Sequence, residues 1–136
     1  MRRIVTTLSL AIVLLLVGCT SNVSPDLKGS YQSDRDGSGY FVQMAFQPDE
    51  NSFVQYIDNR EVDKGVYGET ESHAYKIKSD KQDFEIRLTT EDTFEIIIDQ
   101  LNNRNPITMK NVSDVPTYFS TQFGDEEAYR ALLEEK

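Results

Sequence analysis

The side chains best suited to hold a ligand in this chain are aromatic. The sequence contains seven tyrosines, seven phenylalanines and no tryptophan. Aromatic rings offer a large apolar surface, and a tyrosine hydroxyl can orient a bound molecule through a hydrogen bond. If the rings converge, they predict a cavity for a small apolar ligand; the alternative is that they fill the core of a small domain. The candidate ligand-binding residues are Tyr31, Tyr40, Tyr56, Tyr67, His73 and Tyr75.

Residues for catalysis are scarce. His73 is the only histidine, so it is the only candidate for the base of a Ser–His–Asp hydrolase or for a pH-sensitive ligand contact. It shares a period-two face with Tyr75 and Ile77, where a hydrogen-bonded histidine inside the fold is the simpler interpretation. Neighbouring acids fall only in expected turns or at a helix start, where solvated carboxylates stay ionised: Asp49–Glu50, Glu91–Asp92 and Glu126–Glu127. The sequence therefore predicts no catalytic residue and no enzyme.

The stretch DRDGSGYF, residues 34–41, reads like the opening of a calcium loop. An EF-hand loop needs oxygen ligands at positions 1, 3 and 5, glycine at position 6 and glutamate at position 12. The first four requirements are met by Asp34, Asp36, Ser38 and Gly39, but position 12 is Ala45. Asp36–Gly37 is, in contrast, a strong signal for a β-hairpin turn. We therefore predict a turn between two strands here, and neither a metal nor any other cofactor.

Cys19 is the only cysteine, so no internal disulfide can form. It follows a positive start at Met1–Arg3 and an apolar run over residues 4–17, which is short for a bilayer span but suits the core of a signal peptide. The segment Leu16-Val17-Gly18-Cys19 resembles the lipobox of bacterial lipoproteins. The resemblance implies that the signal peptide 1–18 is removed and that Cys19 carries a diacylglycerol, whose two chains suffice for stable anchoring.

The remaining chain divides into a tether and one domain. Residues 19–26 are polar and contain a proline, so they read as a short tether, and residues 27–136 suit a single domain. With 23 acidic and 14 basic residues the net charge is −9. This charge argues against nucleic acid as a partner and against a domain lying flat on anionic lipid. The expected location is extracytoplasmic, anchored to the bacterial membrane through Cys19.

Apolar residues alternate with polar ones through most of the domain. This period of two predicts half-buried strands over residues 40–46, 53–57, 62–70, 73–78, 84–89, 94–99 and 106–110, after a first strand beginning near Lys28, with a weaker extended segment at 116–123. In the strand 94–99, Phe94, Ile96 and Ile98 face inward and Ile97 is an apolar exception on the solvent side. Short connections favour an antiparallel meander of about seven or eight strands. Closure removes sheet edges, so we expect a small barrel rather than a sandwich.

The last segment changes period. Residues 125–135 predict the single α-helix of a mostly β fold, with Asp125 at its start and Glu126 and Glu127 in the first turn. Ala128, Ala131 and Leu132 form an apolar stripe that would pack against one end of the sheet.

Two similar motifs, Lys28-Gly-Ser-Tyr31 and Lys64-Gly-Val-Tyr67, together with the meander order, carry a second resemblance. Over about residues 27–123 the chain resembles a small lipocalin-like, calycin-type β-barrel. That resemblance implies a carrier or sequestering protein for a small apolar ligand in the barrel. The first function hypothesis is a lipid-anchored binding protein whose partner is an envelope component, another protein or a small ligand, and the alternative is such a carrier. The identity of the partner and the oligomeric state stay open.

Overall fold

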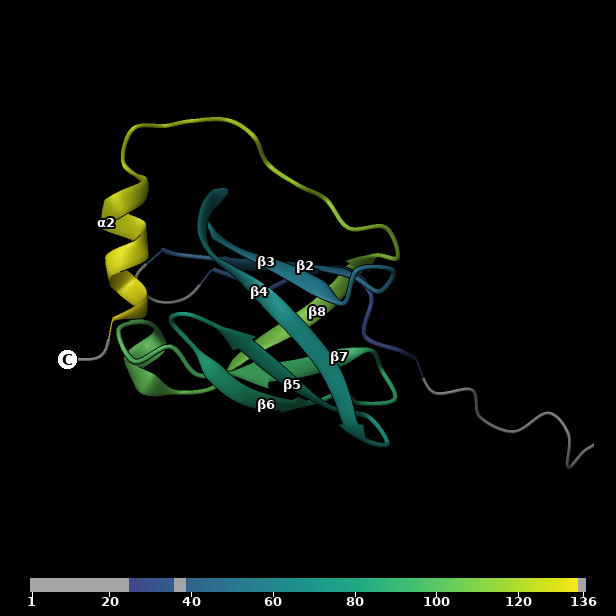
Figure 1. The fold of residues 1–136 in the computed structure, drawn as a ribbon. Helices are drawn as coiled ribbons and strands as arrows, with labels where there is room; N and C mark the ends of the chain where they lie inside the picture. The colour runs from purple at the N-terminus through teal and green to yellow at the C-terminus, as the bar shows by residue number, and fades with distance from the viewer. Residues whose placement is uncertain (1–24, 36–38, 135–136) are drawn as a thin grey trace, which may run out of the picture.

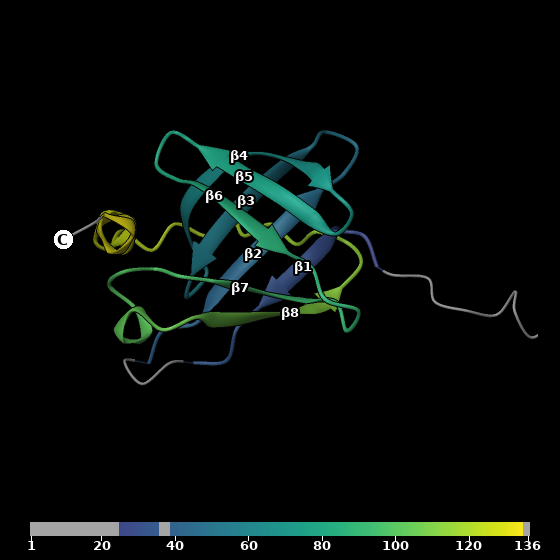
Figure 2. The same cartoon turned by 90° about the horizontal axis from the view of Figure 1, so that it is seen from below.

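A computed structural model describes residues 25–35 and 39–134 of the chain. These residues form eight antiparallel strands that curl into a nearly closed barrel, followed by a short helix (Figures 1 and 2). The prediction of a mostly β meander, a small barrel and one C-terminal helix is confirmed. The strands are β1 (Gly29–Gln32), β2 (Val42–Gln47), β3 (Ser52–Ile57), β4 (Arg60–Glu71), β5 (Ala74–Ser79), β6 (Asp83–Arg87), β7 (Thr93–Ile96) and β8 (Ile107–Ser113).

Part of the sequence interpretation falls outside the described residues. The predicted signal peptide, Cys19 and most of the tether belong there, as does the centre of the predicted turn, residues 36–38. The strands on either side of that turn, β1 and β2, pair antiparallel with Tyr31 opposite Met44. Ala45, at position 12 of the calcium-loop interpretation, lies inside β2. The described residues also contain no cluster of three or more metal-binding side chains.

The strand order across the sheet is β6-β5-β4-β3-β2-β1-β8-β7. Consecutive strands are neighbours from β1 to β6, and the sheet curls round because β8 pairs with β1, placing Asn111 opposite Tyr31. β6 and β7 are therefore the two edges of the sheet, and they run past each other without strand pairing among the described residues (Figure 2). The expectation that closure removes every sheet edge is wrong at this one place, which we call the seam.

The barrel interior is filled by apolar side chains from all eight strands. Phe46 lies among four other rings: its ring centroid is 5.7 Å from that of Tyr31, 6.3 Å from Phe53, 5.1 Å from Tyr67 and 5.9 Å from Phe94. These separations and the mostly edge-on orientations are those of favourable aromatic packing. The centre of the barrel is therefore a packed aromatic core.

The chain leaves β8 as a strap, residues 114–125, that crosses the outside of the barrel (Figure 1). The strap contains no strand, so the extended segment predicted at 116–123 adds nothing to the sheet. Its backbone is held by side chains of the barrel: the Thr117 amide donates to Ser30 Oγ at 2.8 Å, and the Phe119 amide donates to Tyr56 Oη at 3.2 Å. The strap thereby covers part of the outer face of β1 and β3.

The C-terminal helix is shorter than the predicted span 125–135. Helix α2 covers Glu126–Arg130 and tightens into a 3₁₀ turn, η2, at Ala131–Leu133. Leu132 and Leu133 pack against the barrel core, and a tight last turn is common at a helix end. No helix among the described residues has the length and apolar character needed to cross a bilayer.

Arg60 fastens this helix to the barrel. Its guanidinium forms two 3.0 Å hydrogen bonds to the Asp125 carboxylate. The same group lies 3.8 Å from the ring centroid of Phe123 and 4.7 Å from that of Tyr129. The hydrogen bonds to Arg60 lower the pKa of Asp125, as expected for a carboxylate bound by a guanidinium. Paired charge and ring stacking together hold the helix at one end of the barrel.

Candidate functional site

Three of the six candidate ligand-binding residues lie inside the barrel, and their hydroxyls are already engaged. Tyr31 Oη donates to Asp92 Oδ1. Tyr67 Oη donates to the Leu27 carbonyl at 3.1 Å, and the Leu27 amide donates to Tyr75 Oη at 3.2 Å. These hydroxyls therefore bind the protein's own chain. Burial raises the pKa of Tyr67 to about 12 and also raises the pKa values of Tyr31 and Tyr75.

The other three candidates lie elsewhere. Tyr56 projects from the outer face of β3 and packs against Phe119 of the strap at 5.0 Å. Tyr40 precedes β2 and packs edge-on against Tyr129 of α2 at 5.9 Å. The placement of His73 on an inward face is wrong: it occupies the two-residue turn between β4 and β5 with φ 65°, because β5 begins only at Ala74. The six residues thus do not converge on one cavity.

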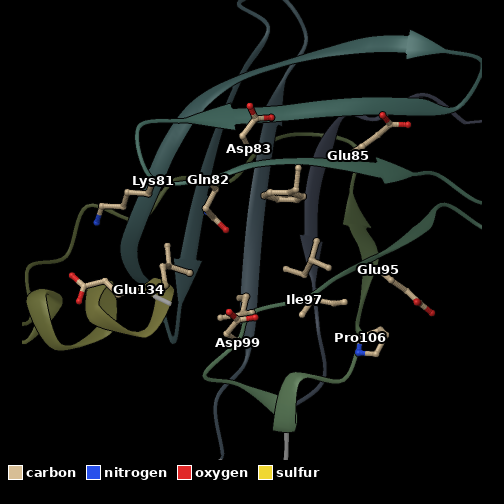
Figure 3. Close-up of a pocket in the computed structure, with 13 residues that line it drawn as sticks. Lys81, Gln82, Asp83, Glu85, Glu95, Ile97, Asp99, Pro106 and Glu134 are labelled. Carbon is tan, nitrogen blue, oxygen red and sulfur yellow. The ribbon is translucent and has the colours of Figure 1, made fainter. Parts of the chain in front are cut away.

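The seam forms a pocket of about 720 Å³ between β6 and β7 (Figure 3). This volume lies within the range of about 300–1,000 Å³ typical of ligand sites. The two strands are held together at one end, where the Thr89 amide donates to the Thr93 carbonyl at 2.9 Å. Away from this turn the pocket opens between them, near the end of the barrel that carries α2, and Leu133 and Glu134 complete its wall.

The pocket has an apolar floor and an acidic rim. The floor is formed by the partly buried Phe84 and the buried Ile96 and Ile98. Ile97, 59% exposed, adds apolar surface beside them. Among the described residues, five acids line the pocket and Lys81 is the only cation that does so: Asp83, Glu85, Glu95, Asp99 and Glu134. Figure 3 shows Glu85 and Glu95 on opposite sides of the opening.

Most of this acidic charge is not neutralised locally. Asp83 forms an ion pair with Lys76 on the outside of β5 at 3.1 Å. Glu85, Glu95, Asp99 and Glu134 form no ion pair with any residue that the structure describes. Four carboxylates around one opening produce a local negative potential that attracts cationic groups.

The free edge of β6 also presents backbone groups that have no hydrogen-bond partner among the described residues. The Gln82 carbonyl accepts a hydrogen bond from the Ser79 amide, and the Leu88 amide donates one to the His73 carbonyl. The backbone amides and carbonyls of the even-numbered residues of β6 therefore point toward β5. Backbone direction alternates along a strand, and the amides and carbonyls of Asp83 and Glu85 therefore point into the seam. In β7 the Asp92 carbonyl accepts a hydrogen bond from the Asn111 amide of β8. By the same alternation, the backbone amide and carbonyl of Glu95 point away from β8 and into the seam.

A polar network forms the inner wall beside Gln82. Gln82 Nε2 donates to Gln55 Oε1 at 2.7 Å and to Asp63 Oδ2 at 2.6 Å, and Ser79 Oγ donates to the same Asp63 oxygen at 2.6 Å. Gln55 is fully buried, and its Nε2 has no hydrogen-bond partner among the described residues. The network fixes the start of β6 relative to β3 and β4, so this side of the pocket is preformed.

The sequence pattern did not predict this site. Alternation identified Ile97 as an apolar residue on the solvent side of the strand 94–99, which was the one available signal. The pairing of β8 with β1, which leaves β6 and β7 as edges, has no local signature.

The sequence matches no protein-family model, no curated protein and no solved structure.

Proposed function

We propose that this protein is a lipid-anchored binding protein of the bacterial envelope, and that its binding face is the seam. The observation that carries the proposal is the coincidence, at one place, of a preformed pocket, an apolar floor, an acidic rim and two unpaired strand edges. An unpaired strand edge is a template for another chain, and apolar surface beside it adds affinity.

Binding at the surface is favoured over carriage in the barrel by the packed interior. The rings around Phe46 contact one another, and the hydroxyls of Tyr31, Tyr67 and Tyr75 bond to the protein itself. A ligand entering this region would have to displace those contacts, each of which is worth about 0.5–1.5 kcal/mol.

The placement of the chain ends suits an anchored binding protein. The described chain begins at Pro25, at the end of the barrel opposite α2 (Figure 1). Leu27 is buried there and bonded to Tyr67 and Tyr75, so the exit point of the tether is fixed. With a lipid on Cys19, that end would face the membrane. The pocket is completed by Leu133 and Glu134 at the other end and would stay accessible.

Site-specific photo-crosslinking in the native envelope tests this proposal. A benzophenone amino acid is placed at Ile97 in the seam or at Val66 on the outer face of β4, two apolar positions that are 59% and 56% exposed. We expect a discrete crosslinked product from position 97 and none from position 66. The product should weaken in the double variant Glu85→Lys, Glu95→Lys, and Cys19→Ala should move the protein out of the membrane fraction.

Equal products at both positions, or none at position 97, would contradict the seam as a binding face. A Cys19→Ala variant that stays in the membrane fraction would contradict the lipid anchor separately.

A further inference from the structure

Building on the proposed function, we infer that the seam binds an extended polypeptide segment in which apolar and basic residues alternate. The segment adds as an antiparallel strand to the free edge of β6. Three features of the seam specify this chemistry: the direction of the backbone groups, the alternation of side chains along β6, and the sign of the charge.

The backbone groups call for a strand. Asp83 and Glu85 direct their amides and carbonyls into the seam, spaced by two residues as in any sheet. A compact small molecule satisfies one such residue, whereas an extended peptide satisfies each of them in turn. Addition of a strand to an exposed edge is an established mode of peptide recognition, in which main-chain bonds supply affinity and side chains supply specificity.

The side chains of β6 specify alternation in the partner. Phe84 faces the pocket floor, while Asp83 and Glu85 face outward. Residues directly opposite each other in an antiparallel pair lie on the same face of the sheet. Partner residues opposite Asp83 and Glu85 would therefore be basic, and those between them would be apolar and lie over Phe84, Ile96 and Ile98.

The charge argues for a different chain rather than a second copy. Two β6 edges paired with each other would bring the acids of one copy within about a Debye length, roughly 8 Å, of the same acids in the other. Like charges directly opposite in a sheet are destabilising, and charged edges are a common defence against self-association. A net charge of −9 adds long-range repulsion between copies and attracts a cationic partner.

The inference is tested with labelled synthetic peptides of about seven residues. The first alternates valine and lysine, the second contains the same residues in blocks, and the third replaces lysine with glutamate. Binding to the full chain is measured by fluorescence anisotropy. We expect saturable binding of the alternating peptide only.

The double variant Glu85→Lys, Glu95→Lys should weaken binding of the alternating peptide by about tenfold or more. The control variant Asp49→Lys, Glu50→Lys makes the same change in net charge on the exposed turn between β2 and β3. Its affinity for the alternating peptide should stay within about threefold of that of the unchanged protein.

Backbone methylation distinguishes strand addition from attraction of charge alone. In the antiparallel arrangement the amides of the lysines face β6, so N-methylation of the lysines should abolish binding while N-methylation of the valines should preserve it. Equal binding of the block peptide, equal loss in the Asp49/Glu50 control, or equal effects of the two methylation patterns would overturn the inference. A dimer of this chain in sedimentation experiments that is lost in the Glu85/Glu95 variant would also overturn it, in favour of a second copy.

Failure of the peptide experiment is distinguishable from failure of the proposed function. A crosslink at position 97 without peptide binding would refute the polypeptide partner and leave the seam as a binding face. Absence of that crosslink would refute both.

Discussion

Phe46→Ala is expected to lower the free energy of unfolding by about 3–5 kcal/mol. Phe46 is fully buried, and its ring contacts those of Tyr31, Phe53, Tyr67 and Phe94. Truncation removes the transfer energy of the ring and leaves a cavity that five strands of a barrel cannot collapse to fill. Since domains are stable by only about 5–15 kcal/mol, much of the total would be lost. Urea denaturation followed by circular dichroism measures the change.

Phe46→Leu is the graded comparison for this prediction. Leucine keeps most of the buried volume, so the loss should be clearly smaller than for alanine. Equal, small effects of both substitutions would mean that the ring is not at the centre of a packed core, and would revive the hypothesis of an open barrel interior.

Alanine at Gly29 or Gly65 is expected to be the next most damaging change. A Cβ atom at position 29 would lie 2.1 Å from the Ser113 carbonyl oxygen, and one at position 65 would lie 2.1 Å from the Lys78 carbonyl oxygen. Both contacts are with backbone that cannot move without breaking a strand pair, so Gly65→Ala should cost about 1–3 kcal/mol. Gly29 also has φ +84°, which adds about 1–2 kcal/mol for alanine.

Gly68→Ala supplies the matched control in β4. A Cβ atom at this position meets nothing within 4 Å and the backbone is not left-handed. We expect a neutral effect or a stabilisation of about 0.4–1 kcal/mol from the smaller entropy of the unfolded chain. Urea midpoints that fall equally for all three alanine variants would show that the close approach at Gly29 and Gly65 is not the cause.

These glycines explain the two motifs that carried the resemblance to a lipocalin-like barrel. In Lys28-Gly-Ser-Tyr31 and in Lys64-Gly-Val-Tyr67 the glycine admits a neighbouring strand, β8 or β5, at close range. The tyrosine two residues later reaches the ring of Phe46 in both cases. The motif is thus a local packing device that occurs at two places in one barrel.

Alternation predicted the strands well where one face is buried and the other is solvated. Phe94, Ile96 and Ile98 are buried and Ile97 is exposed, as the period of two requires. The same rule could not assign Tyr56 to a face, because the strap covers the outer face of β3 and aromatic residues are buried on both sides of this strand. Alternation failed for His73 because this residue lies in a turn with positive φ, where the period of two that holds within β5 does not apply.

The candidate site was harder to predict than the fold for a physical reason. The seam exists because the last strand, β8, pairs with the first, β1, and leaves β6 and β7 as edges. This pairing joins residues far apart in the chain, and no local sequence pattern specifies it. Acidic residues on an edge strand look the same in sequence as acidic residues on any solvated face. Only the three-dimensional arrangement brings Glu85 and Glu95 to the same opening.

Native-state amide hydrogen exchange of the free protein tests the central claim, that the barrel is open at the seam. The amides of Phe84 and Ile86 point toward β5 and that of Phe94 toward β8, whereas those of Glu85 and Glu95 point into the seam. We expect slow exchange for the first three and much faster exchange for the last two, measured residue by residue by NMR. Equally slow exchange of Glu85 and Glu95 would mean that β6 and β7 pair with each other. A closed barrel of that kind would contradict both the binding face and its proposed partner.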